Sequence, residues 1–407
     1  MLIPPPRRML IALVFACQSL LGGLAAMAAD TYALPVSEFS LPTTDGQSVS
    51  LHPGLPIDDP DVKFNVLCFL GTECPLARVY GPRLQRMSDA YESRGVRFIG
   101  INSNVQDSME ELRHYTSAHQ IRFPVAKDYD RSVAVQVGAT RTPEVFVIDR
   151  GGLIRYQGRI DDQYQPGIAR AEATQHDLKD AIEELLAGRP VKIARTTAVG
   201  CLISLPRTAT ISESASNVTF CNQVIRVLSE HCIDCHREGE IGPFTLDDYD
   251  EVVGWADMCL EVIEQGRMPP WHADPAHGQF ANARHMPDSD KRLLQEWVDA
   301  GTPYGNVGDL PPPVARVAGW QLPQSPDAVF QMSDQPFQIP AEGTVEYQYF
   351  VVDPEFKEDK WICAVQVIPG NPAVVHHCIA FTRPPDGADF RDIGLLSAYV
   401  PGQRTAI

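Results

Sequence analysis

Short runs of apolar residues alternate with amphipathic stretches over the first half of the chain. The apolar runs include "NVLCFL", "VRFIGI" and "EVFVID". Between and after them, "MEELRHYTSAHQ" and "HDLKDAIEELLAG" repeat their apolar positions with helical spacing. Strands that alternate with helices are typical of an α/β sheet domain. We therefore expect an α/β domain over residues 35–200.

The pattern changes twice beyond this region. After the polar linker "PRTATISESASN", three periodic stretches, "NQVIRVLSEHC", "YDEVVGWADMCLEVIEQG" and "DSDKRLLQEWVDAG", predict an all-α domain over residues 207–310. After the Pro-rich "LPPPVARVAG", alternation returns in "EYQYFVV" and "KWICAVQVIPGNPAVVHHCIAF". This alternation predicts an all-β domain over residues 320–407, with a hairpin through "PGNP".

The N-terminal stretch indicates export. Basic residues at Arg7 and Arg8 precede an apolar run and the small residues Ala26 and Ala28, so residues 1–29 read as a signal peptide. The mature chain is then periplasmic or otherwise extracytoplasmic. Two alternatives stay open, an uncleaved membrane anchor and a lipoprotein attached through Cys17.

The charge balance narrows the choice of partners. The chain carries 52 acidic against 34 basic residues, a formal net charge of −18. This excess argues against nucleic acid or an anionic membrane surface as the main partner.

A cysteine stands where a strand runs into a helix. "NVLCFL" leads into "GTECPLARVYGPRLQRM", and we expect the helix to begin near Cys74. Unpaired backbone N–H groups and the positive end of the helix dipole favour a thiolate at such a position. Cys74 is therefore a candidate nucleophile. For Cys68, in the middle of the strand, we expect a buried structural role.

This arrangement resembles the thioredoxin/peroxiredoxin superfamily over about residues 35–190. Pro82 lies eight residues after Cys74, where thioredoxins carry a helix proline, and "TRTPEVFVID" supplies the expected cis-proline loop at Thr142 and Pro143. The sequence departs from the family at Ala77, which stands where the second cysteine of a Cys-x-x-Cys motif would be.

The resemblance leaves three functions open for this domain. Cys201, in "AVGCLISLP", could serve as a distant resolving thiol in a thiol oxidoreductase. A peroxidase would need an arginine beside the nucleophile, for which Arg141 and Arg78 are candidates. Gly71 stands where peroxiredoxins carry threonine, and Thr72 follows one place later. The third alternative is an inert scaffold.

The helical region contains "SEHCIDCHREGEIGPF". Cys232, Cys235 and His236 follow the order Cys-x-x-Cys-His, in which one helical turn presents two thiols to the porphyrin vinyls and an imidazole to the iron. A zinc site would need a second compact pair of ligands, and a thioredoxin-type pair would sit in an α/β unit. The motif therefore favours covalent haem c.

The region resembles the small c-type cytochromes, which implies a sixth iron ligand and exchange of electrons with donor or acceptor proteins. In "GRMPPWHA" that ligand would be Met268, held by two prolines. Alternative ligands are His272, His277, His285, Met258 and Met286. Cys221 and Cys259 could form a disulfide or remain free thiols.

Two adjacent histidines, His376 and His377, lie in "VVHHCIAF". Neighbouring side chains of a regular strand point to opposite faces, so one histidine could belong to the core. Both reach one metal only if the strand bulges or if they use different ring nitrogens. If the hairpin turn is centred at Gly370 and Asn371, then Cys363 and Cys378 lie opposite one another and could form a disulfide.

The stretch resembles the first copper motif of the type II copper, ascorbate-dependent monooxygenases, with Cys378 in place of the usual methionine. The resemblance implies the start of a jelly-roll domain, copper held by His376 and His377, an ascorbate-like reductant and a small-molecule or peptide substrate. The remaining copper ligands would lie beyond Ile407, so we expect the chain to be a fragment of the full monooxygenase unit.

The sequence thus predicts an exported multidomain redox protein that transfers electrons through haem c, coupled to a thioredoxin-like thiol domain and an incomplete copper domain. The alternatives are an electron carrier or scaffold with inert outer domains, and a thiol oxidoreductase or peroxidase centred on Cys74.

Overall fold

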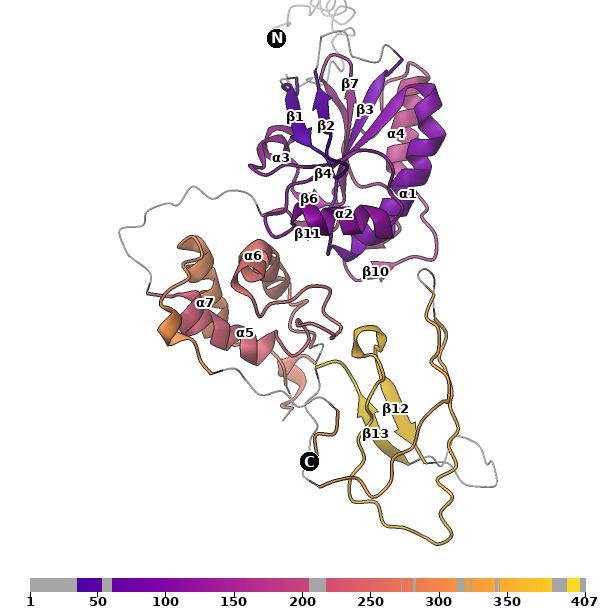
Figure 1. Ribbon diagram of the computed structural model, residues 1–407, viewed down its shortest axis with the longest axis vertical. Helices are drawn as coiled ribbons and strands as arrows, with labels where there is room; N and C mark the ends of the chain where they lie inside the picture. Colours follow the sequence, from indigo (N-terminus) through magenta and orange to yellow (C-terminus); the bar gives the residue numbers. More distant parts are fainter. Residues whose placement is uncertain are drawn as a thin grey trace, which may run out of the picture.

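The computed structural model describes residues 35–52, 61–204, 217–271, 273–280, 283–312, 319–322, 324–340, 343, 345–382 and 394–402. The signal peptide expected over residues 1–29, with its anchor and lipoprotein alternatives, lies outside these ranges, as does His272. Within the described ranges, the structure contains no helix that is both long and apolar enough to span a bilayer. Figure 1 shows an α/β region, a helical region and an extended C-terminal region.

A five-stranded mixed sheet in the order β5-β4-β3-β7-β8 forms the centre of the first region. Its strands are β3 (Phe64–Phe69), β4 (Val96–Asn102), β5 (Val125–Lys127), β7 (Glu144–Asp149) and β8 (Ile154–Gly158). The strands β3, β4 and β5 run parallel, whereas β7 is antiparallel to both of its neighbours. This sheet and its covering helices confirm the predicted thioredoxin-like α/β fold.

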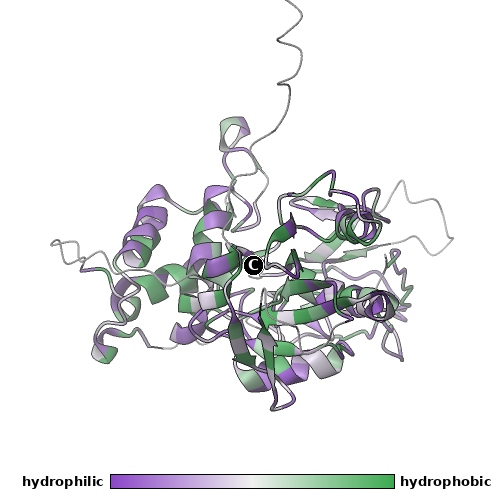
Figure 2. Cartoon of the chain, turned by 90° about the horizontal axis from the view of Figure 1, so that it is seen from above, coloured by the Kyte–Doolittle hydropathy of each residue, from purple (hydrophilic) through white to green (hydrophobic). Residues whose placement is uncertain are grey.

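Both faces of the sheet are buried. Along β3, Val66 and Cys68 join one core cluster, and Leu67 and Phe69 join the other, as the period of two requires. The covering helices are α1 (Pro75–Tyr91), α2 (Met109–Ala118), α3 (Ser132–Val137) and α4 (Asp177–Leu186), with a short turn η1 (Glu92–Arg94) after α1. Figure 2 shows hydrophobic positions concentrated in the strands.

Three small strand pairs complete this domain. They are β1 (Phe39–Pro42) with β2 (Ser48–Leu51), β9 (Tyr164–Gln165) with β10 (Ile168–Ala169), and β6 (Arg141–Thr142) with β11 (Cys201–Leu202). The last pair matters most, because it returns the chain from the end of the domain to the loop beside Cys74.

The helical region contains the three predicted helices. They are α5 (Ile225–His231), extended at its start by η2 (Phe220–Val224), then α6 (Tyr249–Glu264) and α7 (Asp288–Asp299), with short turns η3 (Pro275–His277) and η4 (Val307–Asp309). Trp255 and Trp297 are almost wholly buried. Phe220 packs near Trp297, and the Trp297 indole N–H donates to the Pro303 carbonyl at 3.0 Å. A compact helical core results.

The C-terminal region differs from the prediction. The described part of residues 345–377 contains no strand. The stretch "PGNP" leads into the turn η5 (Pro372–Val374), and β12 (Cys378–Phe381) pairs with β13 (Leu395–Tyr399) downstream. The predicted hairpin is therefore wrong. Asn371 caps η5 by accepting from the Ala373 N–H, which turns the chain away from the expected pairing.

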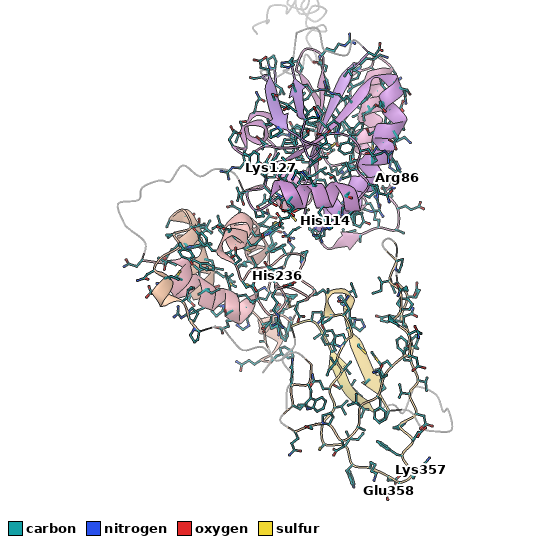
Figure 3. All side chains as sticks on the ribbon, viewed as in Figure 1. Arg86, His114, Lys127, His236, Lys357 and Glu358 are labelled. Atoms are coloured by element: carbon teal, nitrogen blue, oxygen red, sulfur yellow. The ribbon has the colours of Figure 1, made fainter. Side chains whose placement is uncertain are left out.

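The same change removes the predicted cysteine pair. Cys378 lies opposite Tyr399, and Cys363 is an exposed free thiol. Apolar side chains of this region, such as Trp361 and Val351, are largely exposed, so no layer in the described residues covers an alternating face. Figure 3 shows Lys357 and Glu358 at the edge of the C-terminal region that lies farthest from the α/β and helical regions. The jelly-roll architecture stays a prediction.

Candidate active site

Cys74 lies at the junction that the sequence predicts. It is the N-cap residue of α1, after the short turn that follows β3, and its side chain is fully buried. The preceding turn is held by Asp107, whose carboxylate accepts from the Thr72 N–H at 2.9 Å and from the Thr72 hydroxyl at 2.8 Å. The position of the sulfur is therefore fixed by both the helix and the turn.

The predicted cis-proline loop faces this sulfur. The Thr142–Pro143 peptide bond is cis, and the Cys74 thiol donates to the Thr142 carbonyl oxygen at 2.9 Å. Pro82 lies inside α1, as the family resemblance implies. Two of the features expected of a thioredoxin-like site are thus present together.

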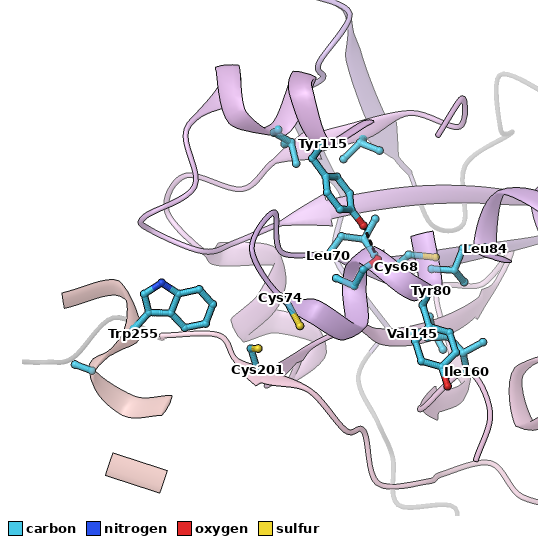
Figure 4. Packing of buried hydrophobic residues seen from close by; sticks show 14 of the residues in the cluster. Cys68, Leu70, Cys74, Tyr80, Leu84, Tyr115, Val145, Ile160, Cys201 and Trp255 are labelled. Atoms are coloured by element: carbon cyan, nitrogen blue, oxygen red, sulfur yellow. Dashed lines mark hydrogen bonds between the residues drawn. The ribbon is translucent and has the colours of Figure 1, made fainter. Parts of the chain in front are cut away.

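Cys201 reaches the same place from the other end of the domain. In the antiparallel pair of β6 and β11, Cys201 stands opposite Thr142. Gly200 makes this approach feasible, since its φ is +149° and a Cβ there would lie 2.1 Å from the Thr142 oxygen. Figure 4 shows the sulfurs of Cys74 and Cys201 turned toward one another.

The two thiols have opposite acidities. Burial disfavours the ionised form of Cys74, but hydrogen bonds from the Cys201 thiol and from the backbone N–H groups of Ala77 and Cys201 outweigh it, so the pKa of Cys74 is lowered. The same hydrogen bond to Cys74, together with burial, raises the pKa of Cys201. Cys74 is therefore the thiol that ionises first, as a nucleophile should.

The remaining cysteine of the sheet fits its predicted structural role. Cys68 is fully buried in β3, and burial raises its pKa far above the ordinary value. Such a thiol stays protonated and unreactive.

The candidate arginines are engaged elsewhere. Arg141 donates to the Gly200 carbonyl at 2.9 Å and forms an ion pair with Glu261 at 2.5 Å, and Arg78 donates to the Thr72 carbonyl at 2.8 Å. Both guanidinium groups thus brace backbone around the site. A role for Arg141 in binding a peroxide stays a prediction.

Helix α6 of the helical region lies over the thiols. Trp255 belongs to the same hydrophobic cluster as Cys74 and Cys201, and Figure 4 shows its ring beside them. The Ser204 hydroxyl donates to the Gly254 carbonyl at 2.6 Å, and the Arg141–Glu261 ion pair joins the two regions a few residues further along. The buried nucleophile therefore lies beneath the helical region.

Sequence reasoning missed the residues that form this cover. Trp255 is a regular apolar position of a periodic helix, and nothing in its spacing indicates which surface it meets. Glu73 and Glu251 each bury one carboxylate oxygen at the interface. The one available signal was Glu73 itself, an acidic residue directly before a buried cysteine.

The Cys-x-x-Cys-His motif begins at the end of α5. Cys232 is the C-cap residue, and its carbonyl accepts from the N–H groups of Cys235 and His236, which closes one helical turn. His236 Nδ1 lies 3.2 Å from the Phe244 carbonyl, an arrangement in which Nδ1 donates and Nε2 is left for a metal. Burial lowers the pKa of His236, which keeps the imidazole neutral. This donor set fits haem c.

Met268 and Gly402 are the other residues that matter around the motif. Met268 lies in the loop after α6, with its side chain exposed. Gly402 approaches Cys235 so closely that a Cβ there would lie 2.5 Å from the sulfur.

The leftover cysteines of the helical region do not pair with one another. Both Cys221 and Cys259 are free thiols in the structure. Cys221 donates its backbone N–H to the Tyr304 carbonyl. Burial, and then the charge of Cys232, raise the pKa of Cys259.

The adjacent histidines converge. His376 Nδ1 and His377 Nδ1 are 2.9 Å apart, because both residues precede β12 and escape the alternation of a regular strand. Cys378 contacts Met332, with their sulfur atoms 3.7 Å apart. Two imidazole nitrogens on one side of the chain fit half of a copper site.

The fold and the paired thiols define the class of the N-terminal region: it is a thioredoxin-like redoxin domain. Residues 33–157 match the AhpC/TSA family. Over 95 residues the chain is 30% identical to the thiol:disulfide interchange protein DsbE of Pseudomonas aeruginosa. This match covers 23% of this chain and 50% of that protein. The chain thus spans about half the length of this curated relative.

Similar solved structures include an uncharacterized conserved protein from Geobacillus kaustophilus, with 28% identity and a TM-score of 0.39 over 44% of this chain and 93% of that chain. Another is the peroxidoxin BcpB from Mycobacterium tuberculosis, with 18% identity and a TM-score of 0.28 over 38% and 93% of the two chains.

The acidity of Cys74 provides a test of the site. In Cys201→Ala, the hydrogen bond that favours the Cys74 thiolate is lost, so we expect the pKa of Cys74 to rise. Its alkylation by iodoacetamide at pH 7 should then slow, about tenfold for each unit by which the pKa comes to exceed 7. The pH dependence of Cys74 labelling, followed by peptide mass spectrometry, measures this change. Cys363→Ala, at an exposed cysteine of the C-terminal region, serves as the control. An unchanged profile in Cys201→Ala would contradict the pairing.

Proposed function

We propose that the N-terminal domain is a thiol–disulfide oxidoreductase in which Cys74 attacks and Cys201 resolves. The observation that carries this proposal is the approach of the two sulfurs across the Thr142 carbonyl. A remote resolving thiol also accounts for Ala77, which removes the local partner found in a Cys-x-x-Cys motif.

The reaction balances with the residues at hand. The Cys74 thiolate attacks one sulfur of a substrate disulfide, the substrate S–S bond breaks, and the first substrate thiolate leaves and takes up a proton. Cys201 then loses its proton and attacks the Cys74 sulfur, which releases the second substrate thiol. The substrate gains two electrons and two protons, and the domain retains a Cys74–Cys201 disulfide. An external dithiol reduces that disulfide and completes the cycle.

Disulfide exchange is favoured over peroxide reduction by the surroundings of Cys74. A peroxidase needs a free guanidinium beside the thiolate, but Arg141 is held by Glu261 and Gly200, and Arg78 by Thr72. The name of the Pseudomonas relative, a thiol:disulfide interchange protein, agrees with this choice.

The helical domain would bind haem c through Cys232 and Cys235, with His236 as one iron ligand and Met268 as the other. When bound, haem supplies a one-electron carrier, and electron donor or acceptor proteins are its proposed partners. The hydrogen bond at His236 Nδ1 supports this assignment because it orients the ring and raises its basicity as a ligand.

The paired nitrogens of His376 and His377 support a copper site at the start of β12, with an ascorbate-like reductant and a small-molecule or peptide substrate as proposed partners.

We further propose that the chain is exported to the periplasm or another extracytoplasmic compartment, on the strength of the signal-like pattern in residues 1–29.

Trapping with glutathione disulfide tests the roles of the two thiols. In Cys201→Ser, the mixed disulfide on Cys74 cannot be resolved, so we expect glutathione to accumulate on Cys74 to near one equivalent, while the wild type retains little. Cys74→Ser should carry no adduct at position 74, and Cys363→Ser should behave as the wild type. Peptide mapping under non-reducing conditions reads out each adduct. Equal retention in the wild type and Cys201→Ser would exclude Cys201 as the resolving thiol.

Export of the chain in cells that attach haem tests the helical domain. We expect one covalent haem per chain by intact mass, lost when Cys232 and Cys235 are both changed to alanine. Met268→Ala should abolish the weak near-infrared band of sulfur-to-iron charge transfer while the haem stays attached. A wild-type chain with no covalent haem would contradict the assignment.

A further inference from the structure

Helix α6 closes the Cys74 site through contacts of several kinds. Trp255 is 1% exposed and Cys74 is fully buried. The fit is close at Gly254, where a Cβ would lie 2.5 Å from the Gln106 side-chain oxygen. A substrate disulfide cannot reach Cys74 while α6 is in this position, so a change that releases α6 would control the reaction.

Two carboxylates, one from each side, are buried in this interface. Glu73 Oε2 and Glu251 Oε2 are buried there without a well-aligned hydrogen-bond partner in the described residues. The nearby Trp255 indole N–H favours the ionised form of both carboxylates, but burial outweighs it. Two ionised carboxylates at close range in a partly dry interface repel one another. Protonation of either group removes that repulsion.

The other charges around the pair favour the proton-bound form. Asp107 and Glu111 act on both carboxylates and add negative charge, and Arg78 is the cation that acts on Glu73. Arg78 lies on α1, Glu111 on α2 and Asp107 in the loop before α2. Negative groups therefore outnumber the positive one at the interface.

We propose that α6 is a proton-controlled cover on the Cys74 site, closed when the Glu73–Glu251 pair holds a proton and released when the pair is fully ionised. The role of the cover in disulfide exchange rests on the proposed function, but its closure does not depend on that function.

The direction of the pH dependence follows from the acidities. Burial first, and then Asp107, raises the pKa of Glu73 to about 7, while burial and then Glu73 raise the pKa of Glu251 to about 7. The ordinary value is 4.5. Closure therefore takes up protons, so it is strongest below pH 4.5 and weakens as the pH rises from 4.5 to about 7. Both carboxyl groups are only partly buried, so solvent screens part of their effect. We therefore expect the closure of α6 to weaken by about tenfold, less than the two pKa shifts taken in full would give.

Hydrogen–deuterium exchange of α6 (Tyr249–Glu264) measures the cover directly. With rates corrected for the intrinsic effect of pH, protection of α6 in the wild type should fall about tenfold between pH 5 and pH 7.5. In Glu73→Gln/Glu251→Gln, neutral amides replace the pair, and we expect high protection at both pH values. Glu264→Gln changes an exposed carboxylate of the same helix and should keep the wild-type fall.

Protection of α4 (Asp177–Leu186), away from the interface, shows whether each variant remains folded. Cys74→Ser keeps the interface carboxylates, so its α6 should show the same pH dependence. A failure of the thiol chemistry is therefore distinguishable from a failure of the cover. Constant protection of wild-type α6 between the two pH values, or an undiminished fall in the double variant, would overturn the proposal.

Discussion

The approach of β11 to β6 is the constraint on which the thiol site depends. It places Cys201 opposite Thr142, whose carbonyl oxygen already lies 2.9 Å from the Cys74 sulfur. Gly200 is required because its backbone passes too close to Thr142 for any side chain. Two cysteines that are far apart in the sequence therefore meet without the Cys-x-x-Cys spacing, and their shared hydrogen bond assigns the lower pKa to Cys74.

The same pairing brings the helical domain onto the site. Arg141, in β6, binds both the Gly200 carbonyl and Glu261 of α6, so one guanidinium links the strand pair to the second domain. Trp255 joins the same buried hydrophobic cluster as the two thiols. Burial of this surface stabilises the arrangement, whereas the two interface carboxylates oppose it. Because apolar burial and carboxylate burial act in opposite directions, uptake of one proton is enough to shift the contact between α6 and the thiol site.

The sequence was most informative where one residue and its neighbours determine the local structure. The start of α1 at Cys74, the cis peptide bond at Pro143 and the periodic helices of the second domain all follow from short patterns, and the structure confirms them. Cys201 could be named only as a candidate, because its partner is set by a long return of the chain. The interface of Glu73, Glu251 and Trp255 was not predictable, since helical periodicity indicates which face is apolar but not what covers it. The hairpin through "PGNP" failed for a related reason: alternation predicts a strand only where a second layer buries one face.

Disulfide mapping of the intact chain tests the central claim most directly. The chain is oxidised with a mild disulfide reagent, digested without reduction and analysed by mass spectrometry. We predict a linked peptide that joins Cys74 to Cys201 and disappears on reduction with dithiothreitol. A fully oxidised chain in which Cys201 is always a free thiol would contradict the account.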